Sequence, residues 1–131
     1  MKLLLDTHIW LWIAFEPSRI APRVREVLAN PENELWLSPI SVWELTLLCR
    51  KGRLRVSPDV PSWVAKTSQE LHLTEAPLTI EVALAVSGLK LLHNDPADGF
   101  IAATAKAFEL TLVTADDKLA RLPGISVLKN R

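Results

Sequence analysis

Short apolar runs that alternate with segments of helical periodicity constrain the fold of this chain more than any other feature. Each run is four or five residues long, which suits a buried strand better than a helix. Parallel strands need a crossover between them, usually a helix, and the alternation provides one. The pattern therefore predicts an α/β domain with a parallel sheet. The predicted strands are 2–5, 34–37, 110–114 and 125–128.

The stretches between these runs carry the start signals and the periodicity of helices. Ser38 followed by Pro39 is typical of an N-cap residue and a proline at the first helical position. After Thr79, which also suits an N-cap, we expect a helix whose apolar face includes Val82 and Leu84. The predicted helices are 7–15, 21–28, 38–52, 59–72, 79–89, 95–108 and 116–122.

Composition and charge restrict the class of protein. With 131 residues, nearly half of them apolar, the chain fits one domain over 1–131 that can bury its core without disulfides. Its single cysteine, Cys49, allows no internal disulfide, so the reducing cytoplasm is the expected setting. A net charge of zero excludes a globally cationic nucleic-acid binder but not a local basic patch. The apolar start ends at Asp6 without a cleavage motif, and no apolar run is long enough to cross a membrane.

Two acids follow predicted strands. Asp6 ends the first run, and Asp116 lies two residues beyond the third. Ligands of open parallel sheets bind outside the carboxyl ends of the strands, so these carboxylates face one crevice if their strands are neighbours. Glu44 and Asp98 lie in the first turns of predicted helices, which begin at that same edge. The four acids thus form a candidate cluster on one rim of the sheet.

A cluster of carboxylates has two interpretations. Like charges at close range raise one another's pKa values, and a divalent cation removes the repulsion. Carboxylates and water are the ligands that Mg²⁺ and Mn²⁺ prefer, and such a cation can activate water against a phosphodiester. Alternatively, these acids cap helices: Asp6 the first, Asp95 or Asp98 the one that follows them, with Asp98 also placed to suit the helix dipole, and Asp116 or Asp117 the last. The residue pattern leaves both interpretations open.

Five short stretches, in order and at suitable spacing, form a larger pattern that runs nearly end to end. They are Leu5-Asp6-Thr7-His8 with Trp10-Leu11-Trp12; Ser38-Pro39-Ile40-Ser41-Val42-Trp43-Glu44-Leu45; Gly52-Arg53-Leu54; His93-Asn94-Asp95-Pro96-Ala97-Asp98 with Phe100-Ile101-Ala102-Ala103-Thr104-Ala105; and Leu112-Val113-Thr114-Ala115-Asp116. This pattern resembles the PIN-domain family, in particular the VapC-like toxins of toxin–antitoxin pairs.

The resemblance implies a fold, an activity and partners. The fold is a three-layer α/β/α sandwich around a parallel sheet of five strands in the order 3-2-1-4-5. The activity is Mg²⁺- or Mn²⁺-dependent endonucleolytic cleavage of single-stranded RNA, which leaves 5′-phosphate and 3′-hydroxyl ends. The implied partners are the RNA substrate, a cognate VapB-like antitoxin and a second copy of the chain in a homodimer.

The resemblance also assigns roles to individual residues. Thr114 matches a hydroxyl residue near the metal, and Asp95 matches a further position that a helix cap explains better. Gly99 departs from the family, whose members often carry arginine directly after the third acid. The missing guanidinium bears on rate and substrate handling more than on metal binding. The acidic metal-binding and catalytic positions of the family fall on Asp6, Glu44, Asp98 and Asp116.

Two other groups of side chains allow a functional and a structural interpretation. A basic run after the helix of Glu44 can bind phosphate, but a solvated helix end whose cations suit the dipole is favoured. The tryptophans can stack bases, but core or subunit-interface positions are favoured, as is a surface or core role for His8. The basic run is Arg50, Lys51, Arg53 and Arg55, and the tryptophans are Trp10, Trp12, Trp36, Trp43 and Trp63.

Two alternatives to a nuclease come from other classes of protein. One is a PIN-like module that binds RNA or protein without cutting it, although such a module has no reason to keep four repelling acids. The other is a phosphatase of the haloacid-dehalogenase type. That class carries a second aspartate two residues after the first, where this chain has His8.

Overall fold

The computed structural model describes residues 1–89 and 95–131, and its sheet has the predicted order. All neighbouring strands pair in parallel, with β1 between β2 and β4. Because β1 and β4 are neighbours, the residues that follow them lie at one edge of the sheet. His93 and Asn94 of the sequence pattern lie outside the described residues. The strands are β1 (Lys2–Leu5), β2 (Glu34–Leu37), β3 (Thr74–Glu75), β4 (Thr111–Thr114) and β5 (Val127–Lys129).

The strand that the apolar pattern did not reveal is β3. It has two residues, both exposed, and it pairs with β2 opposite Trp36 and Leu37. A short edge strand buries no apolar face of its own, so only the family resemblance predicted a fifth strand. The last strand, β5, begins at Val127 rather than at the predicted residue 125.

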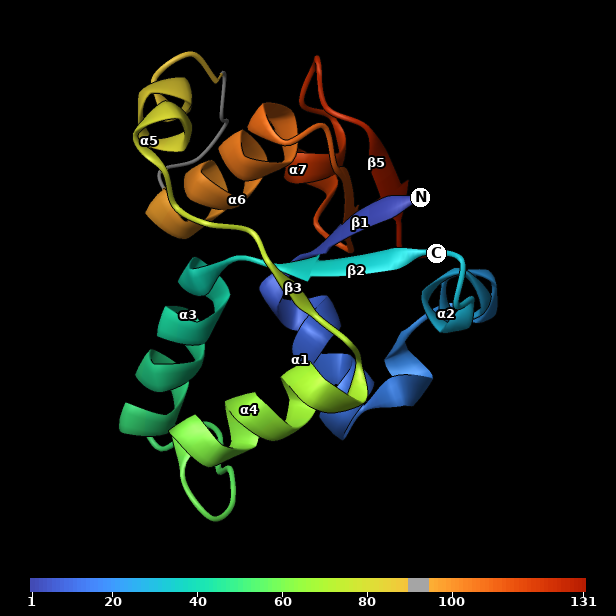
Figure 1. The fold of residues 1–131 in the computed structure, drawn as a ribbon, viewed down its shortest axis with the longest axis vertical. Coiled ribbons are helices and arrows are strands. Elements are labelled where there is room, and N and C mark those ends of the chain that lie inside the picture. Colours follow the sequence, from blue (N-terminus) through green and yellow to red (C-terminus); the bar gives the residue numbers. More distant parts are fainter. Residues whose placement is uncertain (90–94) are drawn as a thin grey trace.

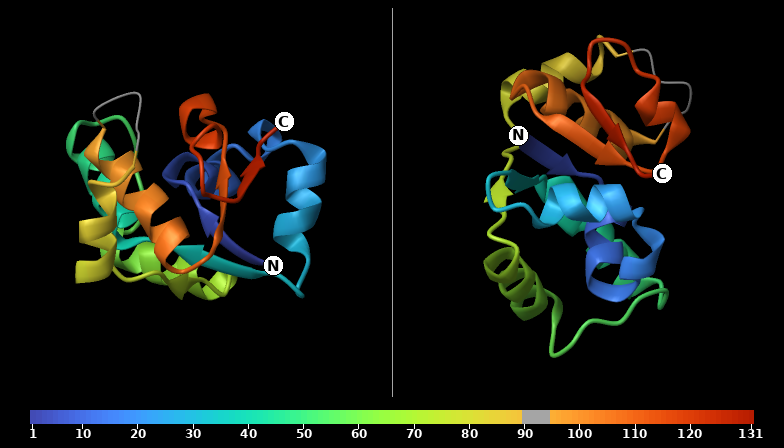
Figure 2. Two further views of the ribbon diagram at one scale, coloured as in Figure 1. Left: turned by 90° about the horizontal axis from the view of Figure 1, so that it is seen from above. Right: turned by 90° about the vertical axis from the view of Figure 1, so that its right-hand side faces the viewer.

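Helices cover both faces of the sheet and make the predicted three layers. Figure 1 shows α1 to α4 on one face and α5 to α7 on the other, and Figure 2 shows the same layers from two further sides. The helices are α1 (Thr7–Phe15), the 3₁₀ turn η1 (Pro17–Arg19), α2 (Pro22–Ala29), α3 (Pro39–Arg50), α4 (Val60–Glu70), α5 (Ile80–Val86), α6 (Pro96–Ala107) and α7 (Asp117–Ala120). Among the described helices, none is long and apolar enough to span a bilayer.

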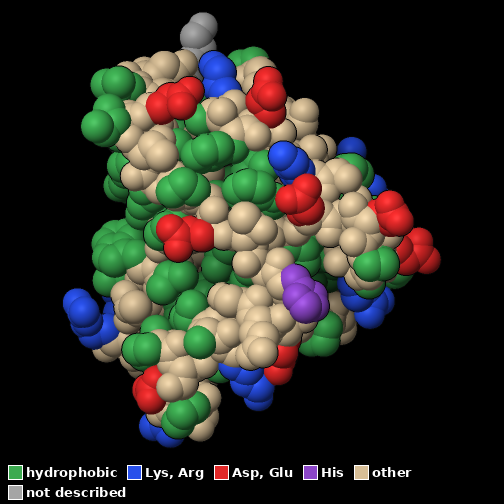
Figure 3. Space-filling model, viewed as in Figure 1, with side chains coloured by type: hydrophobic (Ala, Val, Ile, Leu, Met, Phe, Trp, Pro, Cys, Tyr) green, Lys and Arg blue, Asp and Glu red, His purple; other side chains and the backbone are tan. Residues whose placement is uncertain are grey.

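The apolar face predicted for the helix after Thr79 is partly wrong. Thr79 caps α5, and Val82 is fully buried, but Leu84 is 71% exposed and the helix ends at Val86. Leu84 is two residues after Val82, about 200° around the helix, so it points away from the core. Ile80 is 81% exposed. Apolar side chains gather over α5 in Figure 3, at the upper left of the view.

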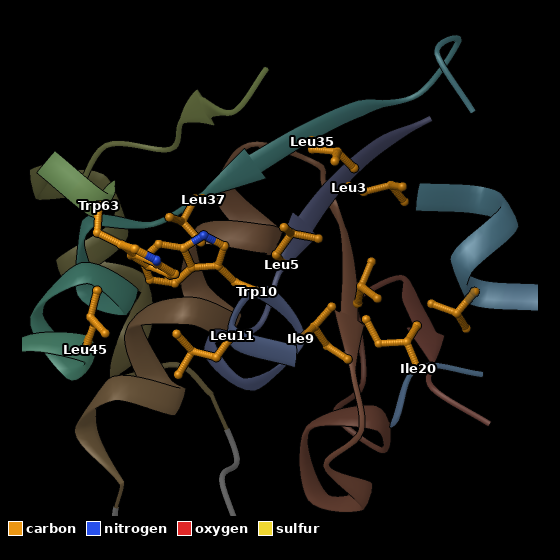
Figure 4. Close-up of a cluster of buried hydrophobic side chains, with 12 residues drawn as sticks. Leu3, Leu5, Ile9, Trp10, Leu11, Ile20, Leu35, Leu37, Leu45 and Trp63 are labelled. Atoms are coloured by element: carbon orange, nitrogen blue, oxygen red, sulfur yellow. The ribbon is translucent and has the colours of Figure 1, made fainter. Parts of the chain in front are cut away.

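Two apolar cores lie on the two faces of the sheet, and β1 contributes to both. Leu3 and Leu5 belong to the core on the side of α1 to α4, whereas Leu4 belongs to the core under α6 and α7. Alternate residues of a strand face opposite sides, so this leucine run is buried on both. Figure 4 shows the first core, where the ring of Trp10 packs 5.3 Å from that of Trp63. Asp6 therefore follows directly on a strand whose last three residues are fully buried.

Candidate active site

One cavity, at the carboxyl ends of β1 and β4, brings all four predicted acids together. Its volume is about 400 Å³. Asp95, which the sequence favoured as a helix cap, also lies in its wall. The cavity is lined by Asp6, His8, Trp12, Arg19, Glu44, Asp95, Asp98, Ala115 and Asp116. The strand-end argument thus placed Asp6 and Asp116 at this rim, and the helix-start argument placed Asp98 there. The prediction that Glu44 lies in a first turn is wrong, because it is the sixth residue of α3, and only the family pattern indicated its place.

Asp6 is both a helix cap and a wall of the cavity. Its Oδ1 accepts the backbone N–H of Thr7 at 2.8 Å and begins α1, and its Oδ2 accepts the hydroxyl of Thr114 at 2.7 Å. Burial raises the pKa of Asp6, and the hydrogen bonds from Thr114 and Thr7 oppose that effect. Each carboxylate oxygen has a second lone pair, so capping does not prevent this group from binding a cation.

Thr114 joins two of the acids, as the resemblance suggested for a hydroxyl residue near the metal. While its hydroxyl donates to Asp6, the same oxygen accepts the backbone N–H of Asp116 at 3.0 Å. Asp116 in turn caps α7, because its Oδ1 accepts the N–H groups of Lys118 at 2.7 Å and Leu119 at 3.3 Å. A single buried threonine therefore fixes the relative position of the carboxylates after β1 and β4.

Glu44 is held by two hydroxyl groups that the sequence analysis missed. The hydroxyl of Thr7 donates to Glu44 Oε1 at 2.5 Å and lies 2.8 Å from the hydroxyl of Ser41. Thr7 has only one hydroxyl proton, so Ser41 donates to Thr7 and a chain runs from Ser41 to Glu44. Burial raises the pKa of Glu44, the bond from Thr7 lowers it, and the charges of Asp95 and Asp6 raise it. The sequence features that could have revealed this chain were the threonine directly after Asp6 and the serine three residues before Glu44 on the same predicted helix.

Asp98 is the half-buried acid on which the charges of the cavity act most visibly. Asp95 is the N-cap of α6, with Oδ1 accepting the N–H of Ala97 at 3.0 Å, and Asp98 stands in the first turn. Burial and the charges of Asp95, Asp6, Asp116 and Glu44 raise the pKa of Asp98 to about 7. Capping therefore explains Asp95, but the position of Asp98 places it among four other negative charges.

The donor chemistry of this cavity fits a hard divalent cation. Five carboxylates line one space, and burial together with their repulsion raises the pKa of Asp98. A bound cation would offset both effects, because its charge favours the ionised carboxylates. Among the described residues, no three Asp, Glu, His or Cys side chains already stand as a set of metal ligands. Mg²⁺ does not require such a set, because it keeps several waters and binds through one or two carboxylates and substrate phosphates.

The rest of the cavity wall contains cationic and aromatic side chains. His8 is exposed, and its ring lies 6.0 Å from that of Trp12. Arg19 was not singled out by the sequence, because a lone arginine before an amphipathic helix looks like ordinary surface. Gly99 is buried in α6 and supplies no side chain. Of the basic run after α3, Lys51 lines a neighbouring groove, while the residues that line the acid cavity include no member of the run.

The tryptophans divide between core and surface. Trp10 is fully buried and Trp63 is 8% exposed, as predicted for core positions. Trp36 stacks on Phe108, and Trp12 lies in the wall of the acid cavity. Trp43 is half exposed on α3 and lines the neighbouring groove.

A five-stranded parallel sheet in the order 3-2-1-4-5, with carboxylates gathered where β1 and β4 end, is the architecture of a PIN domain. The PIN domain family model matches residues 3–125, and the chain belongs to this family. It is 31% identical over 118 residues to Ribonuclease VapC22 of Mycobacterium tuberculosis, covering 89% of this chain and 88% of that protein.

Solved structures share this fold. VapBC2 from Rickettsia felis, crystallised with a DNA fragment from its promoter, superposes with a TM-score of 0.71 at 23% identity, covering 98% of each chain. FitAcB from Neisseria gonorrhoeae superposes with a TM-score of 0.62 at 26% identity, covering 98% of this chain and 97% of that one.

Proposed function

We propose that this chain is a divalent-metal-dependent endoribonuclease that cleaves single-stranded RNA and acts as the toxin of a toxin–antitoxin pair. The observation that carries the proposal is the convergence of five carboxylates in one cavity, where burial and repulsion raise the pKa of Asp98 to about 7. Membership of the PIN-domain family and similarity to a protein named as a ribonuclease support it.

In this proposal Asp6, Glu44, Asp98 and Asp116 would hold Mg²⁺ or Mn²⁺, partly through water. The bound cation would supply activation of water and stabilisation of the negative charge that develops on the cleaved phosphodiester. Thr114 keeps the carboxylate of Asp6 in place, and Thr7 does the same for Glu44. Glu44 either completes the metal-binding set or orients the attacking water.

The decisive experiment is sequencing of RNA ends after expression of the native chain beside the Asp6→Asn form. We expect new 5′-phosphate ends with the native chain and none with Asp6→Asn, because the amide cannot replace a carboxylate that binds a cation. Asp59→Asn is the matched control, since Asp59 is an exposed helix cap outside the cavity and asparagine also caps well. Full activity of Asp6→Asn, or of the native protein in excess EDTA, contradicts the proposal.

The proposed antitoxin site is the groove beside the acid cavity. This groove, of about 240 Å³, shares His8, Glu44 and Asp95 with the cavity and is extended by Trp43 and Leu47 of α3. A helix that binds in a groove places its apolar side chains against apolar residues such as Trp43 and Leu47. The similarity to VapBC structures supports a VapB-like protein as the partner. A small reading frame next to the gene should therefore encode a protein that copurifies with the chain and inhibits it. Trp43→Glu should break that complex and leave RNA cleavage intact.

A homodimer is the second proposed assembly. Leu78, Ile80 and Leu84 expose apolar surface at and before α5, and a second copy would remove that surface from water. Light scattering on the native chain should give the mass of a dimer, and Leu84→Glu should shift it towards the monomer. A monomeric native chain contradicts this part of the proposal.

A further inference from the structure

A guanidinium stands in the wall of a cavity otherwise dominated by carboxylates. Arg19 ends the 3₁₀ turn η1 and lines the same cavity as Asp98 and Asp116. Its guanidinium carbon lies 4.3 Å from the ring centroid of Trp12, a residue of α1 that also lines the cavity. This distance is that of a cation–π stack, which limits the directions that a long arginine side chain can take.

The backbone that carries Arg19 is tied to the strands of the active site. The side chain of Asn130 donates to the carbonyl oxygen of Arg19 at 2.9 Å and accepts the N–H of Ala21 at 2.7 Å. The backbone N–H of Asn130 donates to the carbonyl oxygen of Thr114 at 2.8 Å. The end of the chain accordingly lies beside α2 in Figures 1 and 2. Asn130 thus connects the turn of Arg19 to Thr114, the residue that holds Asp6.

The stacked guanidinium keeps its hydrogen-bonding edge available. Stacking uses the face of the group, whereas its N–H donors lie in its plane in a fork that matches phosphate oxygens. Glu16 Oε2 lies 3.6 Å from one nitrogen, and both side chains of this pair are more than half exposed. An exposed pair of this kind is weak, so a phosphate can replace Glu16 as its partner.

We propose that Arg19, positioned by Trp12, binds a backbone phosphate of the RNA strand next to the phosphate that is cleaved. This inference rests on the proposed ribonuclease function and adds the path of the substrate, which enters the cavity over η1. A polyanion that approaches five carboxylates needs a cation at the rim, and Arg19 supplies it from the wall of the cavity itself. The basic run after α3 is outside that wall.

The binding experiment uses a fluorescently labelled, mixed-sequence single-stranded RNA and proteins that all carry Asp6→Asn, so that the RNA stays intact. Fluorescence anisotropy in Mg²⁺ at several salt concentrations gives the Kd and its salt dependence. We expect Arg19→Gln to weaken binding about tenfold and to reduce the slope of log Kd against log salt by about 0.7, the value for one phosphate contact on a single strand. Arg25→Gln, an exposed arginine of α2 outside the cavity, should change neither quantity.

Two further variants separate contact from positioning. Trp12→Leu removes the stack but keeps the charge, so binding should weaken while the salt slope stays unchanged. Arg19→Lys keeps the charge without the planar fork, so it should restore the slope and only part of the affinity. In the otherwise native chain, Arg19→Gln should raise KM for RNA and leave kcat close to its original value, because the contact lies beside the cleaved bond.

The outcomes distinguish this inference from the proposed function. Equal RNA binding by Arg19→Gln and Arg25→Gln overturns the inference even if the native chain cleaves RNA. If the native chain does not cleave RNA but Arg19→Gln still lowers affinity and salt slope, the inference stands and the nuclease proposal fails. Absence of any RNA binding overturns both.

Discussion

Asp6 and Asp98 share one cavity, but different forces act on their charges. The carboxylate of Asp6 accepts hydrogen bonds from Thr7 and Thr114, which oppose the effect of its burial. The pKa of Asp98, on α6, is raised to about 7 by burial and by the charges of the other acids. One side of the site is therefore organised by hydroxyl and amide donors of the protein. The other side carries repulsion that a cation would remove.

The largest expected effect comes from replacing Asp98, whose pKa is raised by burial and by the charges of the four other acids. Asp98→Asn should lower RNA cleavage by at least about a hundredfold. Mutation of a residue that only supports a metal ligand can already lower activity by up to about a hundredfold, and Asp98 is a proposed ligand itself. The same change should stabilise the metal-free protein above neutral pH, because it removes a charge that burial and the neighbouring acids disfavour. RNA cleavage assays and urea unfolding in EDTA measure the two effects, with Asp59→Asn as the control. Loss of activity together with lower stability would show that Asp98 has a structural role instead.

Thr114→Val tests the organised side of the site. Valine keeps the volume but leaves buried Asp6 without one donor, which should cost about 1.5–3 kcal/mol of unfolding free energy. The Mg²⁺ concentration for half-maximal cleavage should rise about 10- to 100-fold. Thr114→Ser keeps the hydroxyl and should restore most of both quantities. An unchanged Mg²⁺ requirement in Thr114→Val would mean that Thr114 does not position a metal-binding carboxylate.

Thr7→Val should have a smaller effect, because Glu44 is only half-buried and water can replace the lost donor. We expect a loss of activity of about fivefold, below the range for buried supporting residues. Measurement of kcat at saturating Mg²⁺ checks this, with Thr7→Ser as the control. If Thr7→Val lowered activity as strongly as Thr114→Val does, Glu44 would depend on its hydroxyl donor as much as Asp6 does, and the proposed difference between the two carboxylates would be wrong.

The last effect concerns stability alone and is a pH dependence of the unfolding free energy without metal. The folded-state pKa of Asp98 lies near 7 and its ordinary value is 3.8, so the folded protein binds this proton more tightly. Unfolding free energy should therefore fall as pH rises from about 4 to about 7 in EDTA, between the unfolded and the folded pKa of Asp98. Asp6 and Glu44, whose pKa values are also raised, act in the same direction. Urea unfolding of Asp98→Asn should show a flatter profile, and an identical slope would contradict the raised pKa.

The sheet was largely predictable because burial on both faces leaves short, mostly apolar runs, as in residues 3–5 and 110–113. The two-residue strand β3 was not, because exposed edge residues carry no such pattern. Leu84 was assigned to the wrong face because residues two apart, such as Val82 and Leu84, lie on opposite sides of a helix.

The candidate site divides in a similar way. Acids after strands could be assigned to a common rim, since parallel strands end at one edge. The hydroxyl chain from Ser41 to Glu44 and the stack of Arg19 on Trp12 could not be predicted from the sequence, because they join residues from different elements.

The sequence by itself determined the class of fold, the order of its elements apart from β3, and four of the five acids at the rim. These follow from local hydrophobic periodicity, from residues that end strands and begin helices, and from motif spacing. The tertiary structure alone decided that capping and lining the cavity are compatible roles for Asp6, Asp95 and Asp116. It also decided that the charges of five carboxylates act on one another and that Arg19 stands among them. Electrostatic repulsion, hydrogen bonding and stacking depend on distances in space, which the linear order of residues does not specify.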